Sequence, residues 1–386
     1  MRPSVFAAPK AKPPSKGKFN MQIPHELKTL IDIMVEKKAA DLITTVGQPP
    51  LIRIVGDLFP IGDQKLTGED VERFAYGILT PEQFKKFEAT NEVDSSFGIE
   101  NVARFRVNVF RQRGSVAMVI RMLPFEIPTM EALGVPEIAK DWLMVPHGII
   151  ITTGPTGSGK STSQAAMIRY LNEKKRYHIV TIEDPVEFAH KHGLCTIEQR
   201  EVGRDTASFG TALKYVFRQS PDVIMIGEMR DRETFEAALQ LAETGHLVLA
   251  TLHTGDAMQS ITRIIDVFPT EQHQQVRVQL SLVLIGILVQ QLVPRLDQEG
   301  RTLATEVLPA TPAIRNLIRK NELQQIYSVI QTSSAEGMST MNSSLLELFR
   351  RGKISKEQAM LFTTRQKELE EMFGREMRKT VAPSVR

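Results

Sequence analysis

A glycine-rich loop that ends in lysine and serine carries the clearest chemistry in this sequence. Its residues are Gly154, Pro155, Thr156, Gly157, Ser158, Gly159, Lys160 and Ser161, which match the pattern G-x-x-x-x-G-K-[ST]. Glycines let successive backbone N–H groups converge on phosphate oxygens, and a following helix adds the positive end of its dipole. Lys160 would neutralise the β- and γ-phosphates, and the Ser161 hydroxyl would complete a Mg²⁺ coordination shell. We therefore predict that Gly154–Thr162 binds a nucleoside triphosphate.

The segments on either side of this loop supply the context that the motif requires. His147–Thr153 is apolar and β-branched, which predicts a strand, and Thr162–Leu171 has the composition of a helix. A strand, a glycine-rich turn and a helix in this order form the phosphate-binding loop of nucleotide-binding proteins. The alternative, a chance match in an ordinary glycine-rich loop, is disfavoured by these flanks.

Two glutamates follow apolar strands downstream of the loop. Glu228 comes after the apolar segment Pro221–Gly227, and Glu183 ends the apolar segment at residues 178–183. In a P-loop protein an acid at the carboxyl end of a strand lies beside the phosphates, so Glu228 is predicted to hold Mg²⁺. Hydrolysis also needs a carboxylate that deprotonates water, and Glu183 is the candidate. The alternatives are that Glu228 is a turn residue and that Glu183 lies in an acidic loop in which Glu187 pairs with a lysine.

Two histidines bracket one apolar strand. His246 precedes Leu247–Leu252 and His253 follows it, and a neutral imidazole at a strand end is able to sense a γ-phosphate. A lone histidine is usually structural, but two around one strand of a nucleotide-binding domain favour a functional interpretation. His190 and His192 lack an evident third ligand, so they are interpreted as loop residues rather than as a metal site.

Arginines are dense in two adjacent predicted strands. They are Arg104, Arg106, Arg111, Arg113 and Arg121. Alternation along the first strand places arginines on one face and Phe105, Val107 and Val109 on the other. These arginines form either a solvated strand face or a set that neutralises phosphate on a neighbouring subunit. Arg230, close to Glu228, and Arg263 are further candidates for phosphate contacts.

Composition indicates a soluble globular protein with reduced thiols. The 386 residues are 42% hydrophobic and 24% charged, and the net charge of +3 does not require a nucleic-acid partner. The lone Cys195 excludes an internal disulfide and a multi-cysteine zinc site. The apolar run Leu280–Val293 is too short to span a bilayer and is predicted to be a buried helix at a domain or subunit contact. With no signal peptide, we expect a cytoplasmic protein.

The element pattern predicts two domains joined by a stiff linker. Residues 1–20 are basic and proline-rich and are expected to be a disordered tail, followed by an α+β domain at 21–124. A linker at 125–130 leads to a nucleotide-binding domain at 131–378 and a short tail at 379–386. In that domain uniformly apolar strands alternate with helices, which is typical of a parallel sheet buried on both faces. After Val293 the chain is expected to be mainly helical.

Together these segments resemble the PilT/PilU branch of the secretion ATPases, the motors that retract type IV pili in twitching motility. The resemblance covers about Leu27 to Gln358. The matching motifs are Gly154–Thr162 for Walker A, Thr181–Glu187 for the aspartate box, Gly227–Asp231 for Walker B, Glu243–Thr254 for the histidine box and Ala313–Arg319 for a signature of the retraction branch. The assembly ATPases of the superfamily usually carry four zinc-binding cysteines, so that branch is disfavoured.

The resemblance implies a RecA-like P-loop domain, a smaller PAS-like α+β N-terminal domain and a homo-hexamer. It further implies that ATP and Mg²⁺ bind between subunits, where Arg106 and Arg121 reach the phosphates. Glu183 matches the family's general base and Glu228 its acid for Mg²⁺-bound water. The implied partners are an inner-membrane pilus platform protein and a paralogous retraction ATPase, with membrane association only through them. Gly255 replaces the family's usual asparagine, the stretch at 281–286 is unusually apolar and the basic leader is extra, which concerns partner surfaces rather than chemistry.

Three functions remain open from the sequence. The main hypothesis is an ATP-hydrolysing motor that drives pilus disassembly. The second is an accessory PilU-like ATPase or a regulatory ATP-binding partner that docks on the principal motor, against which the complete set of chemical residues argues. The third, a nucleic-acid translocase, requires a basic pore, and no nucleic-acid partner is expected.

Overall fold

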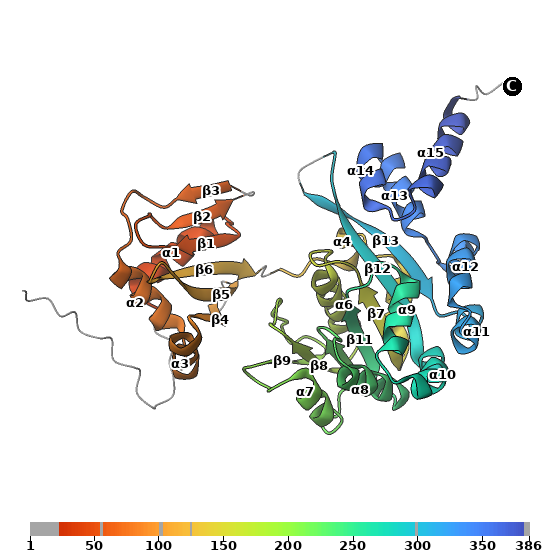
Figure 1. Cartoon of the computed structure of the whole chain (residues 1–386), viewed down its shortest axis with the longest axis horizontal. Coiled ribbons are helices and arrows are strands. Elements are labelled where there is room, and N and C mark those ends of the chain that lie inside the picture. The colour runs from red at the N-terminus through yellow and green to blue at the C-terminus, as the bar shows by residue number, and fades with distance from the viewer. Residues whose placement is uncertain (1–22, 55–56, 100–102, 124–125, 298–299, 382–386) are drawn as a thin grey trace, which may run out of the picture. The chain divides into compact units, whose positions relative to one another are not determined.

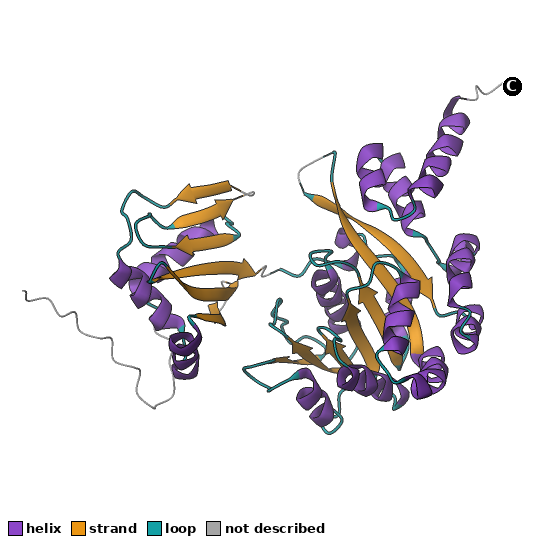
Figure 2. Cartoon of the chain, in the orientation of Figure 1, coloured by secondary structure: helices purple, strands orange, loops and turns teal. Residues whose placement is uncertain are grey.

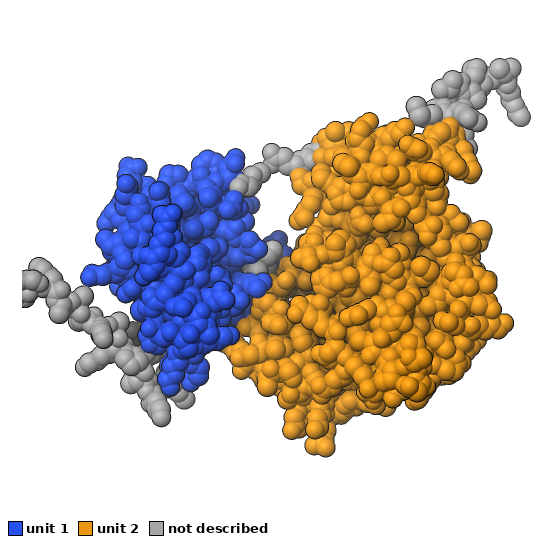
Figure 3. All heavy atoms as spheres, in the orientation of Figure 1, with its two compact units in different colours: residues 1–126 blue, residues 127–386 orange. Residues whose placement is uncertain are grey.

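The chain divides into two compact units, Met1–Glu126 and Ile127–Arg386, in a computed structural model (Figure 3). The structure describes residues 23–54, 57–99, 103–123, 126–297 and 300–381. The tail expected at residues 1–20 lies outside the described residues, as do residues 382–386 of the tail expected at the C-terminus.

The first unit is a six-stranded antiparallel sheet with three helices. Its strands run in the order β3-β2-β1-β6-β5-β4 (Figure 1). Their bounds are β1 Asp41–Thr44, β2 Leu51–Ile54, β3 Asp57–Pro60, β4 Glu92–Ile99, β5 Ala103–Gln112 and β6 Ser115–Leu123, and the helices are α1 His25–Glu36, α2 Gly68–Ile78 and α3 Pro81–Thr90. Phe105, Val107 and Val109 are fully buried, so the alternation predicted for β5 is confirmed. Strands β3 and β4 were not predicted.

Side-chain caps explain where two of these helices begin. The Thr67 hydroxyl accepts from the backbone N–H of Asp70, whose carboxylate accepts from the backbone of Thr67, and Thr80 and Gln83 repeat the arrangement at α3. Each such cap stabilises its helix by roughly 0.5–2 kcal/mol. Both predicted N-caps are therefore confirmed.

The second unit is a seven-stranded sheet in the order β13-β12-β7-β11-β10-β8-β9. Its strands are β7 Gly148–Thr153, β8 His178–Glu183, β9 Thr196–Glu201, β10 Val223–Ile226, β11 Leu247–Leu252, β12 Leu284–Pro294 and β13 Arg301–Pro309. All neighbours pair in parallel except β12 and β13. On β7, Ile149 and Ile151 pack in one apolar cluster and Ile150 in another, because helices cover both faces of the sheet (Figure 2). The parallel doubly covered sheet is confirmed.

Helices occupy most of the rest of this unit. They are α4 Met130–Leu133, α5 Ile138–Met144, α6 Lys160–Lys174, α7 Phe209–Val216, α8 Arg232–Glu243, α9 Ala257–Asp266, α10 His273–Val283, α11 Pro312–Lys320, α12 Ile326–Thr332, α13 Met341–Arg350, α14 Lys356–Phe362 and α15 Gln366–Val381, with short 3₁₀ turns η1 Thr270–Gln272, η2 Leu323–Gln325 and η3 Ser334–Glu336. Among the described residues, none of these helices is long and apolar enough to cross a bilayer.

The prediction of a buried helix at Leu280–Val293 is wrong. Helix α10 ends at Val283, and β12 begins at Leu284 and lies between β7 and β13. A strand buried on both faces is a continuous apolar run without alternation, so periodicity cannot separate it from a buried helix. Strand β13 likewise interrupts the segment expected to be mainly helical, and its pairing with β12 accounts for that difference.

A buried carboxylate fastens the C-terminal helices to the sheet. Glu306 on β13 is 4% exposed, and its Oε1 accepts the backbone N–H of Ala257, the first residue of α9, at 2.9 Å. It also accepts the backbone N–H of Met341, the first residue of α13, while burial raises the pKa of Glu306. One side chain thus satisfies donors at the N-termini of two helices that are far apart in sequence.

Candidate active site

The phosphate-binding loop has a backbone that only glycine adopts without strain. Strand β7 ends at Thr153 and α6 begins at Lys160, and the φ angles of Gly154, Gly157 and Gly159 are +145°, +78° and +87°. A Cβ on Gly154 would overlap the carbonyl oxygen of Gln290 on β12. The glycines are thus required by left-handed backbone and, at the first position, by the neighbouring strand.

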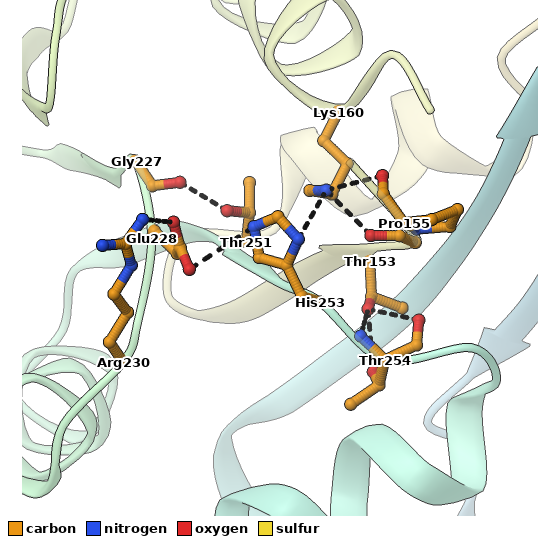
Figure 4. Close-up of polar contacts among 10 residues, drawn as sticks. Thr153, Pro155, Lys160, Gly227, Glu228, Arg230, Thr251, His253 and Thr254 are labelled. Carbon is orange, nitrogen blue, oxygen red and sulfur yellow. Dashed lines mark hydrogen bonds and ion pairs between the residues drawn. The ribbon is translucent and has the colours of Figure 1, made fainter. Parts of the chain in front are cut away.

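The Lys160 side chain lies across the loop. Its Nζ donates to the carbonyl oxygens of Gly154 at 2.8 Å and Pro155 at 3.1 Å, and it lies 3.5 Å from Nδ1 of His253 (Figure 4). Burial lowers the pKa of Lys160, an effect that the nearby Glu228 carboxylate opposes. An anionic ligand in the loop would therefore meet a partly desolvated cation.

The loop fits the phosphates of a nucleotide. Ser158 is 3% exposed, and its Oγ has no hydrogen-bond partner among the described residues. This orphaned hydroxyl, the glycine cradle and the amino end of the fifteen-residue helix α6 all favour an anion. Ser161, in the first turn of α6, and Glu228 offer hard oxygen ligands, which suit Mg²⁺. His190 and His192 lie in the loop between β8 and β9, as interpreted from the sequence.

Glu228 lies between a guanidinium and an imidazole. It follows β10 by two residues, and its Oε2 accepts from Arg230 at 2.7 Å while Nε2 of His253 lies 3.4 Å from its Oε1. The hydrogen bond from Arg230 holds the pKa of Glu228 below its ordinary value. Since an ammonium only donates and a carboxylate only accepts, His253 between Lys160 and Glu228 suits the neutral tautomer protonated on Nε2. Thr251 Oγ1 donates to the Gly227 carbonyl and ties β11 to this turn.

Glu183 has a different environment at the end of β8. Glu183 is 7% exposed, and burial raises its pKa above the ordinary glutamate range. Three donors oppose this effect: the Thr181 hydroxyl at 2.6 Å, the Gln199 amide at 3.1 Å and the backbone N–H of Glu187 at 3.4 Å. A buried carboxylate with a raised pKa at the phosphate edge of the sheet is suited to accept a proton.

The structure separates the two predicted histidines. His253 follows the carboxyl end of β11 and joins the cluster with Lys160, whereas His246 precedes the amino end of the same strand. Six residues of strand span roughly 20 Å, so the ends of β11 lie at opposite edges of the sheet. His246 Nδ1 contacts the carbonyl oxygen of Leu241 at 3.0 Å instead. The expectation that both imidazoles serve one phosphate site therefore does not hold for His246 within this chain.

The candidate arginines occupy different places. Arg106 and Arg121 are register partners on β5 and β6 of the first unit. The Arg121 side chain is 62% exposed, and its Nε donates at 2.8 Å to Asp41, whose side chain is 7% exposed. Arg111 pairs with Glu88 at 2.7 Å, which supports the solvated-face alternative for that residue. Arg230 contacts the site through Glu228.

Several site residues were missed from the sequence. Gln199 on β9 contacts Glu183, and Gln290 on β12 donates to Ser163 Oγ of α6 at 2.7 Å. Arg301 on β13 donates to the carbonyl oxygen of Gly157 at 3.4 Å. The available signal was a pair of glutamines inside the apolar run at 284–293, which marks a polar neighbour on one face of β12. For Gln199, no motif or periodicity pointed to the site.

The fold and the site define a RecA-like P-loop ATPase with a smaller PAS-like α+β domain, so the expected fold class is confirmed. Residues 92–368 match the family model described as Type II/IV secretion system protein. The chain is 46% identical over 334 residues to the "Type IV pilus retractation ATPase PilT" of Pseudomonas aeruginosa, which covers 86% of this chain and 97% of that protein.

Two further relatives agree with this match. The "Type IV pilus ATPase PilU" of Pseudomonas aeruginosa is 44% identical over 335 residues, covering 87% of this chain and 88% of that protein. A crystal structure of the pilus retraction motor PilT with bound ADP has 47% identity and a TM-score of 0.84, covering 89% of this chain and 98% of that one. The chain belongs to the type II/IV secretion system protein family, and the resemblance to its PilT/PilU-type ATPases is confirmed.

Proposed function

We propose that the chain is a Mg²⁺-ATP-hydrolysing motor that drives type IV pilus retraction by removing pilin subunits from the pilus base. The observation that carries the ATPase chemistry is the cluster of Lys160, His253 and Glu228 at the phosphate loop, with a separate buried carboxylate at Glu183. The direction of the motor rests on the PilT relative, which is named for retraction. The RecA-like sheet supports the same proposal because its carboxyl edge gathers all four side chains.

In the proposed mechanism the loop Gly154–Thr162 binds the β- and γ-phosphates, and Lys160 exchanges its loop carbonyls for phosphate oxygens. Ser161 and Glu228 would hold Mg²⁺, and the bound ion would neutralise charge that develops on the phosphates. Glu183 takes a proton from the attacking water. The water oxygen bonds to the γ-phosphorus while the bond from that phosphorus to the β–γ bridging oxygen breaks, leaving ADP and phosphate.

His253 is positioned to report the state of the site. Its ring contacts both the Lys160 ammonium and the Glu228 carboxylate, so movement of Lys160 toward a phosphate would change one of its two contacts. The backbone after His253 leads to Thr254, which bonds to Thr153 and Ser260. Loss of the γ-phosphate would thus alter contacts that lead from His253 through Thr254 to β7 and α9.

We propose further that the working form is a homo-hexamer in which each site is completed by a neighbour. Arg106 and Arg121, on adjacent strands of the first unit, are the side chains proposed to reach phosphate from the neighbouring subunit. Arg121 would then exchange its bond to Asp41 for one to phosphate. The proposed partners are an inner-membrane pilus platform protein and a paralogous retraction ATPase, with a peripheral location on the cytoplasmic side of that membrane.

An accessory PilU-like role is the second candidate, and the relative named PilU supports it equally well. Turnover and phenotype separate the roles. A principal motor should hydrolyse ATP by itself, and deletion of its gene should leave abundant pili without twitching. Preserved twitching after deletion would favour the accessory role, and loss of pili would contradict retraction. Absence of Mg²⁺-ATP hydrolysis above that of a Glu228→Gln control would contradict the enzyme proposal.

A further inference from the structure

Four polar side chains share one face of the sheet at the end of β8. The register of the parallel pair β8–β9 sets Thr181 beside Gln199 and Glu183 beside Glu201. Alternate residues of a strand lie on the same face, and of these side chains Thr181 and Gln199 contact the carboxylate of Glu183. Thr181 and Glu183 belong to the segment that resembles the aspartate box, whereas Gln199 and Glu201 lie outside the motifs of the sequence.

The two oxygens of Glu183 are held unequally. Oε1 accepts both the Thr181 hydroxyl at 2.6 Å and the Gln199 amide at 3.1 Å. Oε2 accepts only the long 3.4 Å contact from the backbone N–H of Glu187 among the described residues. Oε1 is therefore occupied by short side-chain donors, and Oε2 is the oxygen with capacity to accept another proton.

The orientation of the Gln199 amide is determined by the loop at residues 188–190. Its Nε2 also donates to the carbonyl oxygen of Phe188 at 2.8 Å, and its Oε1 accepts the backbone N–H of His190 at 2.8 Å. A backbone carbonyl only accepts and a backbone N–H only donates, so a flipped amide would lose both bonds. The NH₂ group consequently faces Glu183 and acts there as a donor.

We propose that Gln199, together with Thr181, is a positioning residue for ATP hydrolysis: both hold Glu183 ionised in a buried place and leave Oε2 as the oxygen that receives the proton of the attacking water. The inference rests on the proposed role of Glu183 as general base. It also assigns a role to the loop at 188–190, because the backbone of this loop bonds to the Gln199 amide and orients it toward Glu183.

The charges around Glu183 show why donors are needed. Glu187 of the following loop and Glu201 of β9 are like charges, and Glu187 raises the pKa of Glu183 further after burial. Glu228, which follows β10, is paired with Arg230, and Lys160 is the first residue of α6. His190 is partly buried, and this desolvation lowers its pKa to about 4, so it adds no positive charge at neutral pH. Thr181 and Gln199 thus supply the main stabilisation of the ionised form.

The test is the pH dependence of kcat for ATP hydrolysis by full-length variants. Gln199→Met removes the donor at similar side-chain volume. It should move the acidic limb of the pH profile upward by about one pH unit, so that kcat at pH values below the limb is about tenfold lower than in the wild type. Gln199→Glu places a second carboxylate there and should move it further. Thr181→Val should shift the limb in the same direction, whereas Thr181→Ser, which keeps the hydroxyl, should restore the wild-type profile.

Controls separate this inference from the proposed function. Glu198→Gln, one residue away on the opposite face of β9, should leave the limb unchanged, and affinity for fluorescent ADP should be preserved in every variant. If the Gln199 variants lost activity equally at all pH values, or kept the wild-type limb, a positioning role would be overturned. If Glu183→Gln kept full activity, the general-base proposal itself would fail.

Discussion

Two glutamates at neighbouring strand ends of one sheet experience opposite environments. Glu183 ends β8, is buried and contacts neutral donors, which leaves its pKa raised by burial. Glu228 follows β10, is 22% exposed in its side chain and contacts Arg230 and His253, and the hydrogen bond from Arg230 lowers its pKa. The two strands pair directly in parallel, so the difference arises from side chains rather than from position in the fold.

The comparison indicates how one sheet edge supports two roles. A carboxylate beside positive groups stays ionised and is suited to a cation, whereas a buried carboxylate with a raised pKa is suited to take up a proton. The P-loop follows β7 at the same edge, so we expect a bound phosphate to lie near both carboxylates. The predictions below test whether the two carboxylates differ as their surroundings imply.

The largest effect should come from Glu183→Gln. Removing the proposed base should lower kcat by about 10²- to 10⁴-fold, the usual contribution of general base catalysis. Binding of fluorescent ADP should remain within about twofold of wild type, because the loop and Lys160 are unchanged. Steady-state turnover and nucleotide titration measure both quantities, with Glu187→Gln as a control on the same loop. Wild-type turnover in Glu183→Gln would contradict the assignment.

Glu228→Gln should act mainly through the metal. The amide lacks the charge that holds Mg²⁺, so the Mg²⁺ concentration for half-maximal activity should rise by about 10- to 100-fold. Turnover at saturating Mg²⁺ should recover in part, unlike that of Glu183→Gln. Titrations of activity against free Mg²⁺ for both variants check this contrast. An unchanged Mg²⁺ requirement would argue against Glu228 as the metal residue.

The two substitutions should shift thermal stability in opposite directions. The folded-state pKa of Glu183 is raised, so its carboxyl favours folding at low pH and this contribution is lost as pH rises through that pKa. Glu183→Gln should therefore raise Tm at pH 8 by about 2–4 °C and lose this gain toward pH 5. The folded-state pKa of Glu228 is lowered, so its contribution is present at pH 8, and Glu228→Gln should lower Tm slightly. Calorimetry at both pH values measures the Tm of each variant. Shifts of Tm with the same sign in the two variants at pH 8 would contradict the comparison.

The smallest effect should come from Arg230→Ala. Its side chain is 72% exposed, so solvent and salt screen its interaction with Glu228. The half-maximal Mg²⁺ concentration should change by less than about threefold, and the difference from wild type should shrink at high ionic strength. Activity measured at low and at high salt checks this. A large salt-independent loss would instead indicate that Arg230 contacts phosphate directly.

Sequence patterns predicted the parts of the site that are set by residues close together in the chain. The phosphate loop, Glu183 and Glu228 follow apolar strands within a few residues, and the structure places them at one edge of the sheet. Gln199 was missed because it reaches Glu183 only through the pairing of β8 with β9, an edge strand whose residues 198–201 are all polar. Contacts that depend on strand pairing leave no trace in spacing along the chain.

Tertiary pairing also explains the errors. The composition of Leu280–Val293 is common to buried helices and central strands. Residues from Leu284 onward form a strand because β12 pairs with β7 and β13 on either side. The sequence places His246 and His253 at opposite ends of one strand, and the structure brings His253 beside Lys160 while His246 contacts Leu241. Such errors concern which elements become neighbours, not what each residue can do.

The bonds of Glu306 bear on how short an active fragment of this protein can be. A chain that ended after β13 would keep every strand, the P-loop and both glutamates. It would also leave the Glu306 carboxylate without the N–H of Met341 and expose Val293 and Ala304, which pack against Leu345 and Leu346 of α13. Helix α13 is therefore part of the folding unit of the ATPase core, and truncation should be tolerated only beyond it.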